Sequence, residues 1–258
     1  MVRITIFKIL SVPVFGIMYL FTAIMVFSGL PFVYLRQKSI VKSMIRFWAK
    51  TIFRIAGKSV HITGRENLHK DLHYVLVANH SSLFDIVAIV SVIPGIAWFG
   101  HERLLRIPIF RRVLLLTDYV PMRKATVKNT REMVDRLIEK SKTLNIAIFP
   151  EGTRTLSGKI NDFYRGFILL LRSSEGIDVL PVTLNGFYQF KPKSRYWIDF
   201  GSKLEVIIHE PLQRDKLIAR TDREIADIVR STLESKASHF KSSFNKLNSE
   251  IQNNEPAR

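Results

Sequence analysis

A histidine and an aspartate stand five residues apart, directly after a short apolar run. The run is Tyr74–Ala78 and the two side chains are His80 and Asp85. A carboxylate placed one turn beyond a histidine can fix the tautomer of the imidazole and stabilise it once the second nitrogen has taken a proton. Such a pair suits general-base chemistry, although many His-x4-Asp pairs have only a structural role.

A second polar cluster, Glu151-Gly152-Thr153-Arg154, follows another apolar run. The glycine allows close approach of the backbone, the threonine offers a hydroxyl, and the arginine suits two-pronged binding of a phosphate. A capped turn with a surface arginine would explain this cluster equally well if it stood alone. Two polar clusters at the ends of two apolar runs favour a functional site.

The elements that must position these clusters alternate between strand and helix patterns from about residue 58 onward. This alternation predicts an α/β domain with a largely parallel sheet flanked by helices. The expected strands are Val60–Thr63, Tyr74–Ala78, Ile96–Phe99, Ile146–Phe149, Val179–Leu184, Tyr196–Phe200 and Leu204–His209. The expected helices are Leu83–Val92, Val127–Lys142 and a last one that begins with the capping box Thr221-x-x-Glu224. Ligands of such sheets bind at the carboxyl ends of the strands, where both polar clusters are expected.

The 27 residues from Ile9 to Leu35 carry no charge. About 20 apolar residues are enough to cross a bilayer, so the run predicts a membrane-associated segment. It contains four residues that would allow a kink or a shallow helical hairpin: Pro13, Gly16, Gly29 and Pro31. Spanning the bilayer and lying in one leaflet both stay open. A secretory signal peptide fits less well because no small-residue cleavage site follows.

A basic amphipathic helix is expected directly after the apolar run. Basic residues recur every four positions, with apolar residues between them: Lys38, Lys42, Arg46, Lys50, Arg54 and Lys58. The pattern suits an anionic membrane interface, and packing of the helix on its own domain is the alternative. The basic flank places the remainder on the cytoplasmic side of the inner (cytoplasmic) membrane. We expect membrane-associated helices over 1–58, the α/β domain over 59–247 and a polar tail over 248–258.

Composition narrows the class of protein further. Lys and Arg outnumber Asp and Glu by 39 to 22, and this net charge of +17 attracts nucleic acid, anionic lipid or phosphorylated substrates. A nucleic-acid-binding module would explain the charge but not the apolar leader. The chain has no cysteine, which excludes disulfides and a thioester intermediate on the protein. Its seven histidines lack metal-ligand spacing, so neither a metal nor a cofactor is expected.

Together these segments resemble the 1-acylglycerol-3-phosphate acyltransferases, the lysophosphatidic acid acyltransferase family. Asn79-His80 through Asp85 matches the N-H-x4-D motif of the family, and Phe149 through Arg154 matches F-P-E-G-T-R. Three further segments agree with the family pattern: Ile62–Leu68 with G-x-E-N-L, Phe163–Gly166 with F-x-x-G, and Val179–Val182 with a late strand that contains proline. The resemblance covers about residues 60–210.

The resemblance implies roles for both clusters. His80 would be the general base and Asp85 would orient it, while an acceptor hydroxyl attacks an acyl thioester. The residues implied in binding the acceptor phosphate are Glu151, Gly152, Thr153, Arg154 and either Arg123 or Lys124. One block departs from the family pattern, because His101 stands near an expected lysine and Arg111 replaces a glycine. This departure leaves the acceptor open.

The implied reaction moves a fatty acyl group from acyl-CoA or acyl-acyl carrier protein to the sn-2 hydroxyl of 1-acylglycerol 3-phosphate, giving phosphatidic acid. The implied partners are the lysophospholipid, the acyl donor, with acyl carrier protein as one form of it, and an anionic membrane surface, but not nucleic acid. Two alternatives stay open. One is the same chemistry on lyso-ornithine lipid, another lysophospholipid or glycerol 3-phosphate; the other is a non-catalytic membrane adaptor.

Overall fold

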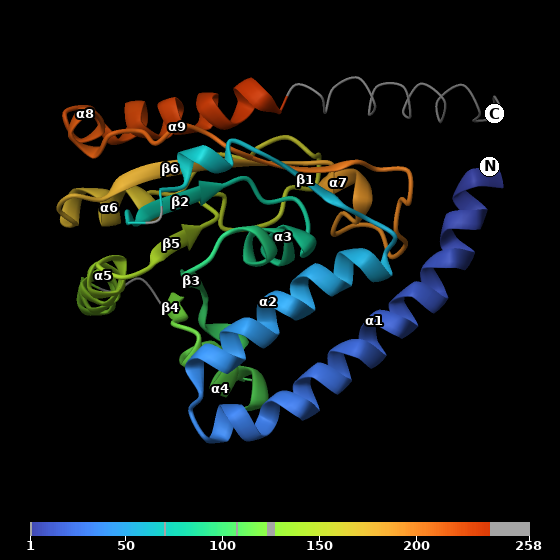
Figure 1. Ribbon diagram of the computed structural model, residues 1–258. Helices are drawn as coiled ribbons and strands as arrows, with labels where there is room; N and C mark the ends of the chain where they lie inside the picture. Colours follow the sequence, from blue (N-terminus) through green and yellow to red (C-terminus); the bar gives the residue numbers. More distant parts are fainter. Residues whose placement is uncertain (1, 70, 107, 123–126, 238–258) are drawn as a thin grey trace, which may run out of the picture.

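The computed structural model describes residues 2–69, 71–106, 108–122 and 127–237, and within them seven strands form one sheet (Figure 1). The strand order is β1-β7-β6-β2-β5-β3-β4. The five strands from β6 to β4 run parallel, whereas β7 is antiparallel to β6 and β1 runs parallel to β7. The bounds are β1 Val60–Thr63, β2 Tyr74–Ala78, β3 Ile96–His101, β4 Val120–Met122, β5 Asn145–Ile148, β6 Asp178–Asn185 and β7 Leu204–Ile208. The predicted largely parallel sheet is confirmed.

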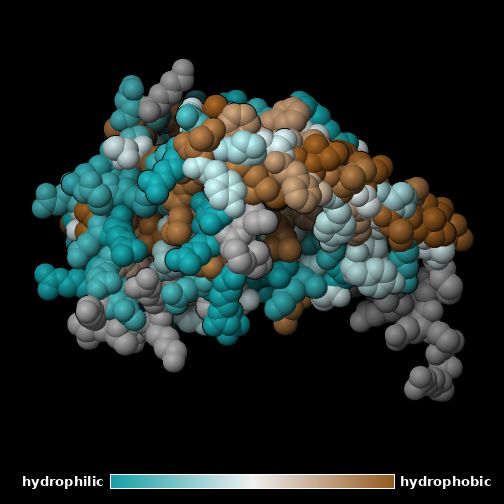
Figure 2. Space-filling model, turned by 90° about the horizontal axis from the view of Figure 1, so that it is seen from below, coloured by the Kyte–Doolittle hydropathy of each residue, from teal (hydrophilic) through white to brown (hydrophobic). Residues whose placement is uncertain are grey.

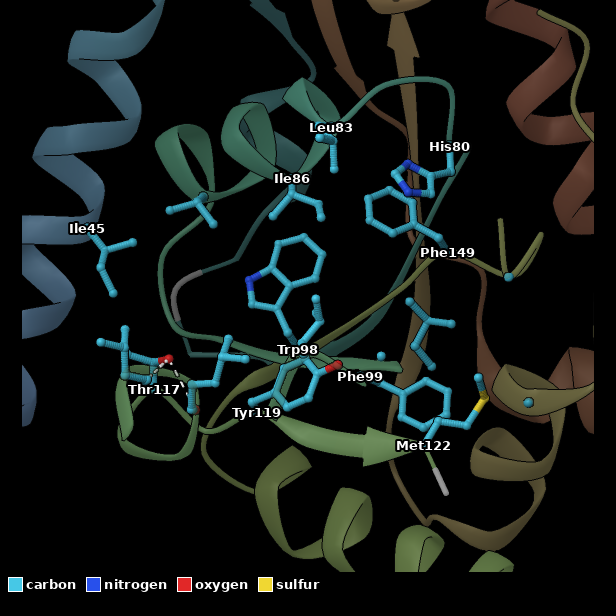
Figure 3. Close-up of a pocket in the computed structure, with 18 of the residues that line it drawn as sticks. Ile45, His80, Leu83, Ile86, Trp98, Phe99, Thr117, Tyr119, Met122 and Phe149 are labelled. Carbon is cyan, nitrogen blue, oxygen red and sulfur yellow. Dashed lines mark hydrogen bonds between the residues drawn. The ribbon is translucent and has the colours of Figure 1, made fainter. Parts of the chain in front are cut away.

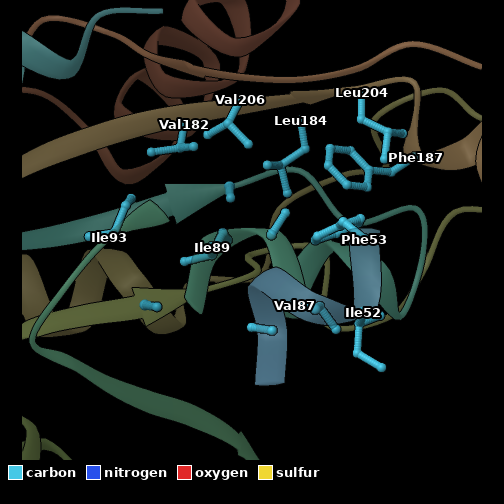
Figure 4. Packing of buried hydrophobic residues seen from close by; sticks show 14 of the residues in the cluster. Ile52, Phe53, Val87, Ile89, Ile93, Val182, Leu184, Phe187, Leu204 and Val206 are labelled. Carbon is cyan, nitrogen blue, oxygen red and sulfur yellow. The ribbon is translucent and has the colours of Figure 1, made fainter. Parts of the chain in front are cut away.

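Helices cover both faces of this sheet, which explains why its central strands are apolar along their whole length. On one face α2, α3 and α7 pack against the strands through residues such as Phe53, Ile89 and Phe187 (Figure 4). On the other face α5, α6, α8 and α9 form a second layer that includes Leu137 and Phe167. The helices are α1 Val2–Tyr34, α2 Lys38–Ile55, α3 Phe84–Val92, α4 Pro108–Leu116, α5 Val127–Ser141, α6 Gly166–Ser173, α7 Phe187–Phe190, α8 Arg214–Ile218 and α9 Asp222–Lys236, with short 3-10 turns at Arg65–Asn67 and Glu102–Arg106.

The apolar leader forms one continuous helix, α1, and α2 returns beside it (Figure 1). The hairpin is therefore made by two helices and not by a bend inside the apolar run. Only four residues of α1 are buried: Ser11, Met18, Gly29 and Val33. By length and composition α1 is able to cross a membrane. Seen from below, apolar side chains gather on the part of the surface where α1 lies, and hydrophilic side chains gather away from it (Figure 2).

Part of the apolar face of the second helix is covered by protein. Val41, Ala49, Ile52 and Phe53 are buried, and the last three belong to the core beneath the sheet. Trp48 donates from its indole nitrogen to the hydroxyl of Thr22 on α1 at 3.0 Å. These contacts agree with packing on its own domain, the alternative from the sequence, and the place of α2 at a membrane interface stays a prediction.

Several of the basic residues of this region also serve internal contacts. Asp118 accepts hydrogen bonds from Lys38 and Lys140 at 2.7 and 2.8 Å, and Lys42 lies 2.8 Å from its second oxygen. Burial raises the pKa of Asp118, but the three lysines outweigh it and hold the pKa well below its usual range. At the other end Lys58 donates to the carbonyls of residues 200 and 202. Polar contacts thus join the chain to the α/β domain at the start of α2 and just after its end.

One predicted strand is wrong and one predicted cap is confirmed. Tyr196–Phe200 is not a strand, because this segment forms a backbone hydrogen bond and ring contacts with α1. The N–H of Ile198 donates to the hydroxyl of Ser11 at 2.8 Å, and the ring of Phe7 contacts Trp197 and Phe200. In contrast, Thr221 and Glu224 form both halves of the expected capping box at the start of α9. Five further helices and strands, α4, β4, α6, α7 and α8, were not anticipated.

Candidate active site

His80 lies just beyond the carboxyl end of β2, where its imidazole contacts a buried carboxylate. Nδ1 of His80 is 2.9 Å from Oδ2 of Asp85, whose side chain is fully buried, whereas 13% of the histidine side chain is exposed. A carboxylate accepts a hydrogen bond from an N–H group, so Nδ1 carries the proton. Nε2 is then the basic nitrogen left for a ligand. The ring stacks on Phe149, with centroids 4.0 Å apart (Figure 3).

The backbone around Asp85 holds this carboxylate in place. Asp85 lies in the first turn of α3, where the helix dipole favours a negative charge. Its Oδ2 also accepts the backbone N–H groups of Ser81 and Ser82, at 2.5 and 2.7 Å. Buried carboxylates are costly unless they are satisfied in this way, so the loop is shaped to satisfy Asp85 and to direct it at His80.

Glu151 holds the same loop from the other side. It follows β5 and is 1% exposed. Its Oε1 accepts the backbone N–H of His80 at 2.6 Å and its Oε2 accepts that of Asn161 at 2.8 Å. Burial raises the pKa of Glu151 to about 7, and the two backbone hydrogen bonds only partly offset this effect. Each oxygen accepts one backbone N–H, so Glu151 holds the loop of His80 in position; the role in phosphate binding that the resemblance implied stays a prediction.

The rest of that cluster is more accessible. Gly152 has a positive φ of 64°, and a Cβ there would meet the ring of Tyr164 at 3.0 Å, so the turn needs glycine. Gly152 and Thr153 are exposed and Arg154 is half-buried. Within the described residues the guanidinium of Arg154 has no ion-pair partner. The predicted Arg123 and Lys124 lie outside the described residues, directly after β4.

Sequence reasoning missed Arg230, which supports the site from α9. It donates to Asp162 at 2.7 Å and to the carbonyl of Ile160 at 3.2 Å, on either side of the residue whose N–H binds Glu151. A further backbone bond, from the N–H of Thr155 to the carbonyl of His80 at 2.9 Å, ties this loop to the histidine. No local pattern reveals Arg230, because its contacts lie about seventy residues away in the sequence.

An apolar cavity of about 1290 Å³ begins at His80 and extends toward the helical hairpin (Figure 3). Aromatic side chains from three parts of the chain line it, among them Trp48, Trp98 and Phe149. Its walls come from the helices α1 to α6 and the strands β3, β4 and β5. The cavity is larger than the roughly 300–1,000 Å³ that suits most small ligands, so it has room for a long apolar one.

Comparisons with known proteins agree with this site. The family described as Acyltransferase matches residues 59–185. A chloroplast 1-acyl-sn-glycerol-3-phosphate acyltransferase of Arabidopsis thaliana is 27% identical over 206 residues, which are 78% of this chain and 57% of that protein. The 1-acyl-sn-glycerol-3-phosphate acyltransferase of Borreliella burgdorferi is 28% identical over 77% of this chain and 79% of its own length. The chain thus spans little more than half of the plant relative.

A solved structure extends the agreement to the fold. The crystal structure of the 1-acyl-sn-glycerophosphate acyltransferase PlsC from Thermotoga maritima matches with a TM-score of 0.76 and 25% identity, over 91% of this chain and 99% of that one. The His–Asp pair, the sheet edge and the apolar cavity define a class of acyl-transferring enzymes. The chain belongs to the acyltransferase family that includes the 1-acylglycerol-3-phosphate acyltransferases, as its motifs predicted.

Proposed function

We propose that the protein transfers a fatty acyl group from an acyl thioester, acyl-CoA or acyl-acyl carrier protein, to the sn-2 hydroxyl of 1-acylglycerol 3-phosphate, which yields phosphatidic acid. The observation that carries the proposal is the His80–Asp85 pair at the mouth of a large apolar cavity. Names of the relatives point to the same acceptor. The exposed Thr153 and the half-buried Arg154 stand at the neighbouring strand end, where a phosphate would be accessible to both.

The chemistry needs no protein nucleophile. Nε2 of His80 takes the proton of the acceptor hydroxyl while that oxygen attacks the thioester carbonyl. The tetrahedral intermediate collapses, the carbon–sulfur bond breaks, and the departing thiolate takes the proton from the imidazolium. Asp85 keeps Nδ1 protonated and stabilises the imidazolium between these steps. General-base help of this kind contributes about 10²–10⁴-fold to the rate.

Membrane association is part of the proposal, because both the acceptor and the product are lipids. The exposed side chains of α1 are apolar over most of its length, and α1 and α2 wall the cavity that leads to His80. An acyl chain is thus able to pass from the bilayer into the cavity without crossing water. The basic flank of the leader favours the cytoplasmic side of the membrane for the α/β domain, where an anionic surface attracts its positive charge.

An acyl-transfer assay on the detergent-purified protein tests the proposal. Labelled acyl-CoA and acyl-acyl carrier protein are offered with lysophosphatidic acid, other lysophospholipids, lyso-ornithine lipid and glycerol 3-phosphate. His80→Ala is expected to lower turnover by about 10²–10⁴-fold, since the general base is gone. His61→Ala, at an exposed position of β1, is the matched control and is expected to retain turnover.

Each outcome of this assay has a definite meaning. Phosphatidic acid formed by the wild type and His61→Ala but not by His80→Ala supports the proposed reaction. Turnover with another acceptor only would keep the mechanism and change the substrate. Full turnover in His80→Ala would overturn the assignment of the base. No turnover with any pair, by a folded protein, would leave a non-catalytic adaptor as the better reading.

A further inference from the structure

A third loop reaches the edge of the sheet where His80 lies, and the motifs do not include its basic residues. It follows β6, the strand that pairs with β2 on the side opposite β5. After β6 the chain turns at Gly186, whose φ is 82° and which has no room for a Cβ, and continues through α7 to Lys191. Because β6, β2 and β5 are parallel, Lys191 and Arg154 leave the sheet at the same edge, one on each side of His80.

Hydrogen bonds fasten this loop to both motif loops. The hydroxyl of Ser82, two residues from His80, donates to the carbonyl of Lys191 at 2.6 Å. The hydroxyl of Tyr188 donates to the carbonyl of Leu156, two residues beyond Arg154, at 2.7 Å. The backbone of Lys191 is therefore held next to the loop that carries His80. Neither hydrogen bond uses the side chain of Lys191.

The side chains of this loop carry positive charge; Asp199 lies near Arg195, whereas in the described ranges Lys191 has no such acidic neighbour in an ion pair. The amine of Lys191 contacts only the carbonyl of Pro192, at 3.2 Å, and within the described residues it forms no ion pair. Burial lowers the pKa of Lys191, and the nearby charges of Arg195 and Arg154 lower it further. Lys191, Arg195 and Arg154 thus lie close enough for their charges to repel one another, which costs free energy until an anion binds among them.

The third cation has a different part in the cluster. The guanidinium of Arg195 donates to the carbonyls of Gln189, Phe190 and Trp197, and it lies 3.9 Å from the ring centroid of Trp197. These contacts use its donors to hold the loop in shape. Lys191 and Arg154 are the two cations whose donors are left for a ligand.

We propose that Lys191, together with Arg154, binds a phosphate group carried by a substrate, and that Arg195 holds Lys191 in place and adds to the positive field. The inference rests on the proposed acyl transfer and assigns to the loop after β6 a binding role that the sequence motifs do not include. Two substrates would bring such a phosphate: the acceptor, through its headgroup, and the donor, through its phosphopantetheine or CoA portion. Phosphate chemistry is common to both, and kinetics separates them.

The test compares Lys191→Gln with Lys191→Arg and with the control Lys193→Gln, which removes an exposed charge two residues further on. A charge-assisted hydrogen bond to phosphate corresponds to an expected rise of about 10- to 100-fold in the KM of the substrate whose phosphate binds here. The Lys191→Arg and Lys193→Gln variants are expected to stay within a few-fold of the wild type, and kcat is expected to change little. A rise in KM for the acceptor alone identifies the headgroup, and a rise for the donor alone identifies the donor phosphate.

A binding measurement keeps the outcome independent of turnover. Inorganic phosphate is expected to raise the thermal unfolding temperature of the wild type and of Lys193→Gln, and not that of Lys191→Gln. If a folded Lys191→Gln variant keeps both KM values and the phosphate-induced shift, the inference is overturned. Failure of the wild type to transfer acyl groups at all would instead defeat the proposed function, and the unfolding shift would still decide whether Lys191 binds phosphate.

Discussion

The polar loops that follow β2 and β5 and the helix α1 both depart from the usual distribution of polar and apolar groups. The loops bury carboxylates, and α1 exposes apolar side chains. At the strand ends two carboxylates, Asp85 and Glu151, are fully buried. Along α1, large apolar side chains such as Leu20 and Phe27 are 64% and 70% exposed. Most folded chains bury such apolar groups and expose carboxylates. Both regions are therefore costly by themselves, and each needs something that offsets its cost.

The two regions differ in where that compensation comes from. The buried carboxylates are satisfied inside the chain, by backbone N–H groups of the loops around His80. The apolar surface of α1 has no such cover among the described residues, so its compensation has to come from outside the protein. Substitutions in the first region should thus act on stability and catalysis in any solvent, whereas substitutions of the exposed side chains of α1 should act only where lipid is present.

The largest effect is expected for charges placed on α1. In the double variant Leu20→Lys/Phe27→Lys, each lysine near the centre of a bilayer costs about 2.5–3.5 kcal/mol, so binding to anionic lipid vesicles should weaken at least about 100-fold. Unfolding in detergent should change by less than about 0.5 kcal/mol, because both positions are exposed. Vesicle co-sedimentation and thermal unfolding measure the two quantities.

The matched control for α1 is Leu72→Lys, which charges an exposed leucine in the loop before β2. It should bind vesicles as the wild type does. If the α1 variant binds vesicles as well as the wild type does, α1 is not in contact with lipid. The contrast between the two regions would then be wrong.

A smaller effect, measured as a change in the pH dependence of stability, is expected from Glu151→Gln. The pKa of Glu151 is raised to about 7, so between about pH 4.5 and 7 the folded protein keeps a proton that the unfolded chain has released. Stability therefore falls as pH rises through this window, by up to about 3 kcal/mol. Glu151→Gln cannot ionise and should lack this fall. Denaturant unfolding near pH 5 and near pH 8 measures the difference in the free energy of unfolding. An equal change of this free energy with pH in both proteins would show that the buried carboxyl ionises at no cost.

The sequence predicted the parts of the site that depend on near neighbours. The His80–Asp85 pair could be predicted because five residues and a helix start determine its geometry. The strands that carry both clusters were predicted from their apolar runs and lie where expected. Glu151 was found, but its support of the His80 loop was not, since a motif does not show that both oxygens face backbone N–H groups.

Features that depend on contacts between distant segments could not be predicted. Tyr196–Phe200 alternates like a strand, but its apolar residues pack on α1, almost two hundred residues earlier in the chain. The cavity has the same origin, because walls from α1, α2 and β3 come together only in the folded protein. The apolar pattern shows which residues avoid water without showing what they meet.

The smallest effect is expected for Arg230, and it tests how far from His80 the hydrogen bonds that support the buried carboxylates extend. Arg230→Met removes the hydrogen bonds that hold residues 160 and 162, and with them the support of the N–H that binds Glu151. Loss of this second layer should lower kcat by about 5- to 10-fold, equivalent to about 1 kcal/mol, with KM little changed. Arg230→Lys should restore part of the loss, since it keeps the charge.

Glu234→Gln is the control, because it breaks only the helix pair between Glu234 and Nε of Arg230, at 3.0 Å, and leaves the loop contacts in place. The positive charge of Arg230 also lowers the pKa of Glu151, so Arg230→Met should move the pH-dependent fall in stability to higher pH. A purely structural role would lower stability equally at all pH values. If Arg230→Met and Glu234→Gln have the same kcat and the same pH profile, the support of His80 ends at Glu151 and does not reach α9.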